Sequence, residues 1–334
     1  MSALAACCAA VYNRRMAEAA AETPPRLDPR KFRDPLVTAA GEPRAQIALR
    51  SLDTLWFNTG TLCNLTCENC YIESSPRNDR LAYLSATEVA RYLDEIATLG
   101  LGTRLIGFTG GEPFMNRDLP AMLDDALSRG FDAIVLTNAM KPMLHKRRAL
   151  LALRERYGDR LTLRVSLDHY APSVHELERG AQTWAPTIDG LRWLGANDFR
   201  INVASRYLSG ESEAALRDGF RRLFGELGIA LDAGDPVQLM IFPEMDATAD
   251  VPEITTACWD ILGKSPDSVM CATSRMVVKH KGAASPTVAA CTLLPYDKLW
   301  DLGPDLAGAT TGAVPLNHPH CARFCVLGGA ACSG

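Results

Sequence analysis

The segment Thr59-Gly-Thr-Leu-Cys63-Asn-Leu-Thr-Cys67-Glu-Asn-Cys70-Tyr71 decides how the rest of the chain is interpreted. It follows directly on an apolar stretch for which we predict a β-strand, so the three cysteines fall on the loop that leaves the strand end. Their intervals of three and two residues allow one loop to present three sulfur atoms toward one point.

The chemistry of three close thiols points to a metal centre. Thiolates are soft ligands that suit zinc or iron–sulfur clusters. Structural zinc usually takes four protein ligands, whereas this segment has no nearby fourth cysteine, and the next histidine is the distant His145. Three thiols therefore indicate an iron–sulfur cluster with one iron left open.

Outward from this segment, short apolar stretches alternate with amphipathic ones. We predict strands at residues 52–59, 104–109, 132–137, 161–167, 200–205 and 237–242, and helices at residues 86–99, 119–128, 142–157, 185–194 and 213–226. The first helix begins with a capping box, Ser85 followed three residues later by Glu88. Alternating strands and helices predict an α/β fold with a parallel sheet, whose chemistry collects at the carboxyl ends of the strands.

Composition excludes several classes of protein. Hydrophobic residues make up 47% of the 334 residues and charged residues 22%, which is typical of a folded protein. With 35 Lys and Arg against 39 Asp and Glu, no basic excess indicates nucleic acid or a membrane surface as a partner. No apolar run is long enough to span a bilayer, and the start, MSALAACCAAVYNRR, is a poor secretory signal because no basic residue precedes its apolar stretch. We expect a cytoplasmic protein.

The two ends of the chain differ from this middle part. Residues 1–50 hold five of the 20 prolines, which predicts a short helix at most and then an extended arm, and the adjacent Cys7 and Cys8 are interpreted as incidental. After about residue 250 the alternation stops and the chain becomes rich in cysteine and loops. We therefore predict an N-terminal arm (1–50), a barrel (51–250) and a small cysteine-rich domain (251–334), in which a metal centre supplies cross-links.

The CxxxCxxC spacing followed by Tyr71 resembles the radical S-adenosylmethionine (SAM) enzymes. The resemblance implies a partial (β/α)6 barrel and a [4Fe–4S] cluster held by Cys63, Cys67 and Cys70. In that family the open iron chelates the amino and carboxylate groups of SAM. A reduced cluster then cleaves SAM to methionine and a 5′-deoxyadenosyl radical, which removes hydrogen from a substrate.

A second motif, Gly110-Gly111-Glu112-Pro113, ends the second predicted strand. Two glycines there allow a close approach of the backbone. The motif is similar to the family's GGEP segment, which contacts the amino group of SAM, and Tyr71 is assigned to the same cofactor by its place after the cysteines.

The end of the fourth predicted strand, Val165-Ser166-Leu167-Asp168-His169, is similar to a family segment in which a serine and a later arginine hold the carboxylate and ribose of SAM. The resemblance assigns these roles to Ser166 and Arg179, since a guanidinium can bond both oxygens of a carboxylate. Asp168 and His169 are candidates to face the substrate, the alternative being a hydrogen-bonded loop. Asn202 and Arg206 have a similar place near the fifth strand.

The C-terminal cysteines resemble the auxiliary-cluster domains, SPASM or the shorter Twitch form, found in many radical SAM enzymes. This sequence has six such cysteines instead of seven and lacks the CxxC-x5-CxxxC block, so a Twitch-like domain with one auxiliary [4Fe–4S] cluster fits better. The expected ligands are Cys271, Cys291, Cys321 and Cys325, with Cys258 or Cys332 as alternates. A zinc site remains the alternative, which His318 and His320 would favour as ligands.

The sequence thus predicts a radical SAM enzyme whose auxiliary cluster assists oxidation. The resemblance implies that many peptide-modifying relatives carry a leader-binding domain ahead of the barrel, for which a proline-rich arm of 50 residues is short. This favours a small-molecule substrate, or a peptide delivered by a separate protein. The alternatives are a maturase of a ribosomally made peptide and a non-catalytic zinc-binding scaffold. A one-electron donor such as flavodoxin or ferredoxin is the expected protein partner.

Overall fold

The computed structural model describes residues 25–329, which form two compact units that are described separately below. The larger unit comprises Ser51–Ile241 and Ser274–Thr310. The smaller unit comprises the described residues up to Arg50, then Phe242–Thr273 and the described residues from Thr311 onward.

A single sheet forms the centre of the larger unit. Its strands are β2 (Thr54–Asn58), β3 (Leu105–Thr109), β4 (Asp132–Thr137), β5 (Leu161–Ser166), β6 (Arg200–Arg206), β7 (Leu239–Phe242), β8 (Ser274–Val278) and β9 (Thr287–Ala289), in the spatial order β7-β6-β5-β4-β3-β2-β8-β9. The pairs from β2 to β6 and the pair β2–β8 are parallel, whereas β8 and β9 are antiparallel. The α/β barrel class expected from the sequence is confirmed.

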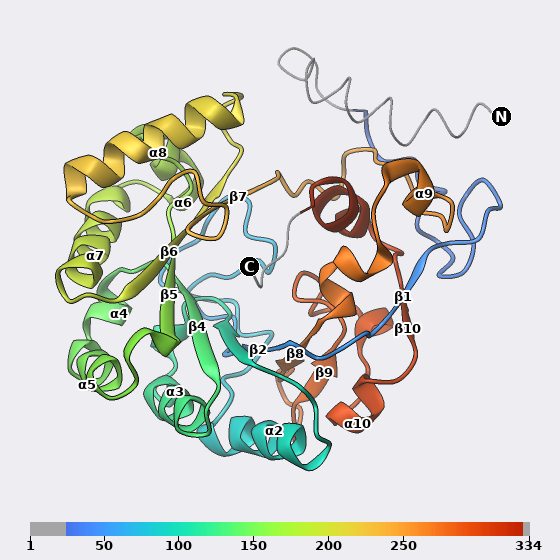
Figure 1. Ribbon diagram of the computed structural model, residues 1–334. Helices are drawn as coiled ribbons and strands as arrows, with labels where there is room; N and C mark the ends of the chain where they lie inside the picture. Colours follow the sequence, from blue (N-terminus) through green and yellow to red (C-terminus); the bar gives the residue numbers. More distant parts are fainter. Residues whose placement is uncertain (1–24, 330–334) are drawn as a thin grey trace. The chain divides into compact units, whose positions relative to one another are not determined.

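Helices follow the strands and lie around the outside of the sheet (Figure 1). They are α2 (Ala86–Thr98), α3 (Leu119–Ser128), α4 (Lys141–Leu144), α5 (Arg147–Tyr157), α6 (Pro172–Arg179), α7 (Trp184–Ala196) and α8 (Glu213–Leu227). The predicted capping box begins α2: the Ser85 hydroxyl accepts the Glu88 N–H at 3.2 Å, and the Glu88 carboxylate accepts the Ser85 N–H at 2.9 Å. Such a cap contributes about 1 kcal/mol.

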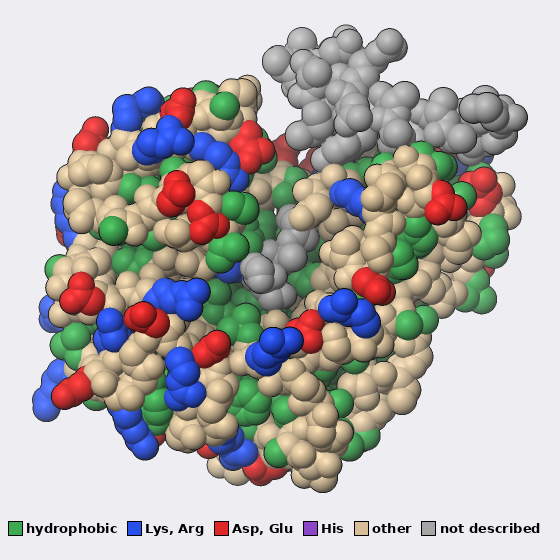
Figure 2. All heavy atoms as spheres, viewed as in Figure 1, with side chains coloured by type: hydrophobic (Ala, Val, Ile, Leu, Met, Phe, Trp, Pro, Cys, Tyr) green, Lys and Arg blue, Asp and Glu red, His purple; other side chains and the backbone are tan. Residues whose placement is uncertain are grey.

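The core lies between the sheet and these helices. Every residue of β2 is buried, and the ring of Phe57 stacks on that of Phe108 at 5.7 Å between centroids. Val89 and Leu93 of α2 are buried, so the apolar residues that recur with the period of a helix form the side that packs on the sheet. On the visible face of the larger unit, acidic and basic side chains are intermixed (Figure 2).

The structure differs from the predicted elements in three places. The helix expected at residues 142–157 is in fact two helices, α4 and α5. The sequence does not reveal the break between them, because the apolar residues Met143 and Leu150 have the spacing of one continuous amphipathic helix. Helix α6 was not predicted. Strand β8 falls in the stretch predicted as an irregular domain, yet it pairs with β2, which precedes it by more than 200 residues.

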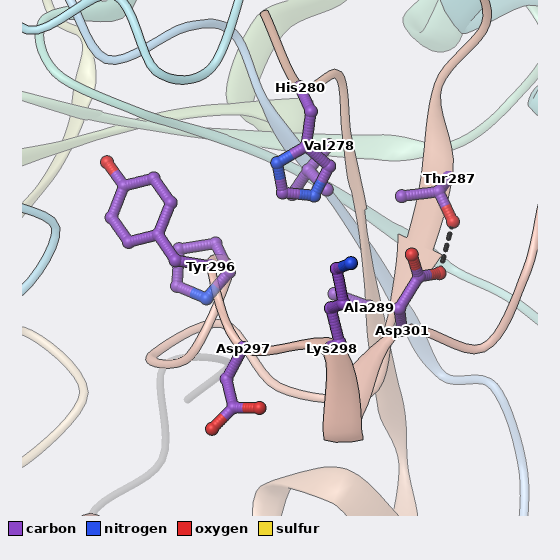
Figure 3. A pocket seen from close by; sticks show the side chains of 9 residues that line it. Val278, His280, Thr287, Ala289, Tyr296, Asp297, Lys298 and Asp301 are labelled. Carbon is purple, nitrogen blue, oxygen red and sulfur yellow. Dashed lines mark hydrogen bonds between the residues drawn. The ribbon is translucent and has the colours of Figure 1, made fainter. Parts of the chain in front are cut away.

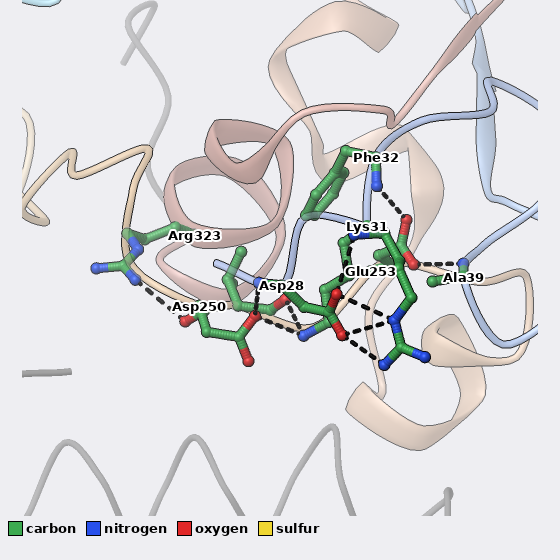
Figure 4. Close-up of polar contacts among 9 residues, drawn as sticks. Asp28, Lys31, Phe32, Ala39, Asp250, Glu253 and Arg323 are labelled. Atoms are coloured by element: carbon green, nitrogen blue, oxygen red, sulfur yellow. Dashed lines mark hydrogen bonds and ion pairs between the residues drawn. The ribbon is translucent and has the colours of Figure 1, made fainter. Parts of the chain in front are cut away.

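The smaller unit contains β1 (Gln46–Ala48) paired antiparallel with β10 (Ala313–Pro315), the helix α9 (Cys258–Leu262) and a π-helix at Cys321–Leu327. Residues 25–50 run along the segment near residue 250. Glu253 accepts backbone N–H groups of Phe32 and Ala39, both at 2.7 Å, and pairs with the buried Arg44 at 2.5 Å (Figure 4). The predicted short N-terminal helix, Cys7 and Cys8 lie outside the described residues, and the three-domain division stays a prediction.

Candidate active site

The cysteine loop, residues 59–85, joins β2 to α2 and carries all three predicted cysteines. Cys63 is buried, and Cys67 and Cys70 are half-buried. Backbone N–H groups donate to two of the sulfurs, Leu65 to Cys63 at 3.4 Å and Ser74 to Cys70 at 3.3 Å. Burial first, and also the nearby charges of the other two thiols, raise the pKa of Cys63 to about 12. The sulfurs of Cys63 and Cys70 thus each accept a hydrogen bond that favours the thiolate form.

Within residues 25–329, no three His, Cys, Asp or Glu side chains form a group that could hold a single metal ion. A zinc ion requires all of its ligands around one centre. A cubane cluster instead spreads its thiolates over different irons, so its ligands stand farther apart. The donor set of the cysteine loop consists of thiols only, which is the chemistry that an iron–sulfur cluster requires.

Asn116 fixes both ends of the cysteine loop. Its side-chain amide donates to the Thr59 carbonyl at 3.2 Å and to the Leu84 carbonyl at 2.8 Å. Asn116 is 2% exposed, so these two hydrogen bonds form away from water. The sequence analysis did not identify this residue.

The glycines of the second motif pack against the first part of the cysteine loop. The Gly111 N–H donates to the Gly60 carbonyl at 2.8 Å, and the Glu112 N–H donates to the Leu62 carbonyl at 3.2 Å. A Cβ atom at Gly111 would lie 2.2 Å from the Leu62 carbonyl oxygen, and one at Gly110 would lie 2.5 Å from the Gly60 oxygen. Gly110 also has a φ of +143°, which a side chain would strain. The two motifs identified in the sequence are therefore in direct backbone contact.

The Glu112 side chain connects the ends of β3 and β4. Its carboxylate accepts the Asn138 N–H at 2.8 Å, the Thr137 hydroxyl at 2.9 Å and the Phe114 N–H at 3.2 Å. Burial raises the pKa of Glu112 to about 7, although these hydrogen bonds favour the charged form. A fully buried carboxyl group is thus held in one orientation beneath the glycine turn.

Asp168 and Arg179 form a buried ion pair at the end of β5. Arg179 Nε donates to Asp168 Oδ2 at 2.6 Å and Nη2 donates to Oδ1 at 3.2 Å, while Arg206 Nε lies 3.5 Å from Oδ1. Burial by itself would raise the pKa of Asp168, but the positive charges of Arg179 and Arg206 more than offset it, and the pKa is lowered. Asp168 is therefore ionised and engaged by cations, a pairing that the sequence did not reveal.

His169 belongs to a separate network at the same end of the sheet. Its Nδ1 accepts the Ala171 N–H at 2.9 Å, so in neutral His169 the proton is on Nε2, which lies 2.8 Å from a Glu211 oxygen. Ser209 and Tyr170 also donate to Glu211, at 2.6 Å each, and these hydrogen bonds lower its pKa to about 2. Glu211 was missed in the sequence because it lies more than 40 residues from its partner.

The remaining predicted residues lie on β5, on the cysteine loop and within β6. Ser166 is half-buried at the end of β5, and its hydroxyl makes no hydrogen bond within the described part of the chain. Tyr71 is half-buried on the cysteine loop, and Asn202 is buried on β6.

The C-terminal cysteines are distributed over both units. Cys271, in the turn Met270–Ala272, and Cys321 and Cys325, in the π-helix, belong to the smaller unit, whereas Cys291 belongs to the larger one. The wide turn of a π-helix places residues four apart on one face. Cys258 is buried at the start of α9, where its sulfur accepts the N–H of Thr255 at 3.4 Å, and Cys332 lies outside the described residues.

Burial lowers the pKa of His318 and of His320 to about 4, and their rings are 4.6 Å apart. Both imidazoles are consequently neutral near pH 7. Neutral imidazole is the form that binds metal, so the chemistry on which the zinc alternative depends is present in these two side chains.

A pocket of about 170 Å³ lies beside β8 and β9 in the larger unit (Figure 3). It is lined by Val278, His280, Thr287, Ala289, Pro295, Tyr296, Asp297, Lys298 and Asp301. Tyr296 also donates its hydroxyl hydrogen to the Ile72 carbonyl at 2.8 Å, and the Arg80 guanidinium lies 3.5 Å over its ring. None of the residues predicted for the active site lines this pocket, but Tyr296 joins its wall to the cysteine loop.

Three thiols lie on the first strand-end loop of a parallel strand–helix barrel, and this loop packs against a double-glycine turn from the next strand. This arrangement is typical of the SAM-dependent radical enzymes. Comparison with known families agrees: residues 57–221 match the family model described as the Radical SAM superfamily. Residues 57–221 therefore form a domain of this superfamily, whose members use a [4Fe–4S] cluster and SAM, and the resemblance seen in the sequence is confirmed.

Two curated relatives illustrate the similarity. The antilisterial bacteriocin subtilosin biosynthesis protein AlbA of Bacillus subtilis is 30% identical over 143 residues, which cover 42% of this chain and 30% of AlbA. A GTP 3′,8-cyclase of Tolumonas auensis is 27% identical over 139 residues, covering 41% of this chain and 39% of the relative. The chain thus spans less than half the length of either relative.

Among solved structures, Streptococcus suis SuiB bound to S-adenosylmethionine superposes with a TM-score of 0.55 at 13% identity, covering 75% of this chain and 63% of SuiB. This likeness concerns the fold. Within residues 25–329, no helix has the length and apolar character needed to cross a membrane. The cytoplasmic location stays a prediction.

Proposed function

We propose that this protein is a radical SAM enzyme in which Cys63, Cys67 and Cys70 hold a [4Fe–4S] cluster with one iron open to SAM. The observation that carries the proposal is the packing of the cysteine loop against the Gly110–Gly111 turn, in a chain whose residues 57–221 form a domain of the radical SAM superfamily. When bound, the cluster and SAM would supply the 5′-deoxyadenosyl radical that removes hydrogen from a substrate.

The protein's own part is to bind and orient these groups. We assign the SAM carboxylate to the Ser166 hydroxyl and to Arg179, whose Nη1 is not used in the pair with Asp168. Asp168 then orients Arg179 and does not itself face the substrate, since it is 2% exposed. We assign binding of the SAM amino group to backbone groups of the Gly110–Glu112 turn, and a contact with the same cofactor to Tyr71.

For the C-terminal cysteines we propose an auxiliary [4Fe–4S] cluster with the ligands Cys271, Cys291, Cys321 and Cys325. The four thiols and the shared helix face of the last two support this assignment. Such a cluster would accept an electron from the substrate radical that remains after hydrogen abstraction, which would complete the oxidation of the substrate. Flavodoxin or ferredoxin is the proposed electron donor for the first cluster.

We propose a peptide as the substrate, because AlbA is named for the biosynthesis of a bacteriocin and SuiB has been solved bound to the precursor peptide SuiA. The small molecule expected from the sequence is the second candidate. It is favoured by the similarity to GTP 3′,8-cyclases, which are named for a nucleotide.

The experiment is anaerobic reconstitution with iron and sulfide, reduction with dithionite, and measurement of 5′-deoxyadenosine formed from SAM. We expect a brown protein that forms 5′-deoxyadenosine and a Cys67→Ala variant that forms none. A colourless, zinc-loaded protein without SAM cleavage would refute the proposal and support the zinc scaffold.

GTP is the direct probe for the substrate class. Consumption of GTP with formation of a new nucleotide product would overturn the peptide proposal. With no conversion of GTP, modification of a peptide encoded beside the gene, detected as a mass change, is the expected result.

A further inference from the structure

The two residues between Cys67 and Cys70 are held from outside the cysteine loop. The Glu68 N–H donates to the backbone carbonyl of Glu178 at 2.9 Å. The Glu178 carboxylate accepts the Asn69 N–H at 3.0 Å and the Asn69 side-chain amide at 2.9 Å. Glu178 is 4% exposed and lies in the last turn of α6, so a buried helix residue fixes the conformation of the turn that carries two thiols.

Arg206 completes this arrangement from the end of β6. Its Nη1 donates to the Asn69 carbonyl at 3.1 Å, its Nη2 forms an ion pair with Glu178, and its Nε lies 3.5 Å from Asp168. The N–H, the carbonyl and the side-chain amide of Asn69 are therefore all bonded to Glu178 or Arg206.

The same residues set the charge beside the thiols. Asp168 and Glu178 carry two negative charges and Arg179 and Arg206 two positive ones, so the four-residue network is neutral. Arg206 donates to the Asn69 carbonyl and Glu178 accepts the Asn69 N–H, so one cation and one anion of this network lie directly against the turn between Cys67 and Cys70.

We propose that Glu178 and Arg206 are positioning residues for the cluster: they clamp the Cys67–Cys70 turn in the geometry that presents both thiols, and they balance the charge next to Cys67. This inference rests on the proposed function. A loop held in its binding conformation before the cluster arrives spends less conformational entropy when it binds. A charge added to or removed from a buried site beside a redox centre shifts its potential, because reduction adds one negative charge.

The first test measures cluster retention in the reconstituted full-length protein, as iron released to a chelator over time. We expect Glu178→Ala to lose iron about tenfold faster than wild type, since it lacks two charge-assisted hydrogen bonds to Asn69. Glu178→Gln keeps an acceptor for the Asn69 N–H and should fall between them.

Glu88→Gln is the matched control for retention. Glu88 likewise accepts a backbone N–H, from Ser85 at 2.9 Å, and pairs with a cation, Lys279 at 2.6 Å, but it does not touch the turn between the thiols. Circular dichroism of each apo protein identifies any variant that has not folded. Folded Glu178 variants that retain iron as well as wild type and Glu88→Gln would overturn the clamp.

The second test measures the midpoint potential of the cluster by a redox titration followed by electron paramagnetic resonance. Arg206→Gln leaves the network with one excess negative charge and should shift the potential to more negative values. Glu178→Gln leaves one excess positive charge and should shift it to more positive values, while Arg206→Lys keeps the charge and the wild-type potential.

A merely structural role would not produce shifts of opposite sign. Equal potentials, or shifts of the same sign in Arg206→Gln and Glu178→Gln, would overturn the charge-balancing role. Failure of the wild-type protein to bind iron at Cys63, Cys67 and Cys70 would instead refute the proposed function, so the two failures are distinguishable.

Discussion

Gly111→Ala should destabilise the protein through a steric clash between two backbone segments. The added Cβ atom would lie 2.2 Å from the Leu62 carbonyl oxygen, 2.6 Å from the Leu62 carbonyl carbon and 2.7 Å from the Thr61 carbonyl oxygen. All three are backbone atoms, so no side chain can turn aside and the two segments must separate. The hydrogen bonds from Gly111 to Gly60 and from Glu112 to Leu62 then weaken as well.

The magnitude follows from these two effects. Overpacking in a dense region costs about 1–3 kcal/mol, and each weakened hydrogen bond about 1 kcal/mol. We therefore expect Gly111→Ala to lower the free energy of unfolding of the apo protein by about 3 kcal/mol. After reconstitution it should also bind less iron, because the displaced segment leads into Cys63.

Gly102→Ala is the matched control. It lies in the same unit, and a Cβ atom there would meet no heavy atom within 4 Å. Its stability should stay within about 0.5 kcal/mol of wild type. The assay is urea denaturation followed by circular dichroism, together with iron analysis. A Gly111→Ala protein as stable as Gly102→Ala, with a full complement of iron, would refute the argument that the two motifs require backbone contact.

Four further changes test the site and the proposed auxiliary cluster. Asn116→Ala leaves two buried carbonyls at the ends of the cysteine loop without a donor. It should lower the free energy of unfolding, measured by urea denaturation, by about 2–3 kcal/mol. A decrease below about 0.5 kcal/mol would contradict the role given to the Asn116 amide. Folding raises the pKa of Glu112 from 4.5 to about 7, so its folded state binds the proton more tightly and the stability it contributes is lost as the pH rises from about 4.5 to 7. Glu112→Gln should therefore gain about 3 kcal/mol relative to wild type across this range, and a pH-independent difference would show that the carboxyl does not titrate there. Asp168→Asn leaves two guanidinium groups without their shared carboxylate and should lower the free energy of unfolding by about 3–5 kcal/mol. Asp125→Asn, which removes a more exposed ion pair, should lower it by less than about 1 kcal/mol. Equal decreases in the two variants would exclude a strong buried pair at Asp168. Finally, if the auxiliary cluster accepts an electron from the substrate, Cys321→Ser should preserve 5′-deoxyadenosine formation and abolish product, and unchanged product formation would exclude that role.

Local patterns predicted most of the barrel because its elements are short and strongly periodic. The predicted bounds of 119–128 and 132–137 agree with α3 and β4, and the capping box at Ser85 forms as expected. These features depend on residues within a few positions of one another. They can be identified without knowledge of the fold.

Helix α6 was missed because its pattern is reversed. Leu177 is 81% exposed, whereas His175 and Glu178 are buried toward the site. This pattern is amphipathic in the opposite sense to that of a helix whose apolar side packs on a core.

By itself, the sequence determined the alternation of strands and helices, the three thiols on the first strand-end loop and the glycine turn after the second strand. Only the tertiary structure decided the partners of these residues: Asp168 with Arg179, Glu178 and Arg206 on the Cys67–Cys70 turn, and β8 beside β2. The physical reason is that periodicity and turn chemistry act between neighbours in the chain, whereas a buried charge takes whichever partner the folded chain brings within reach.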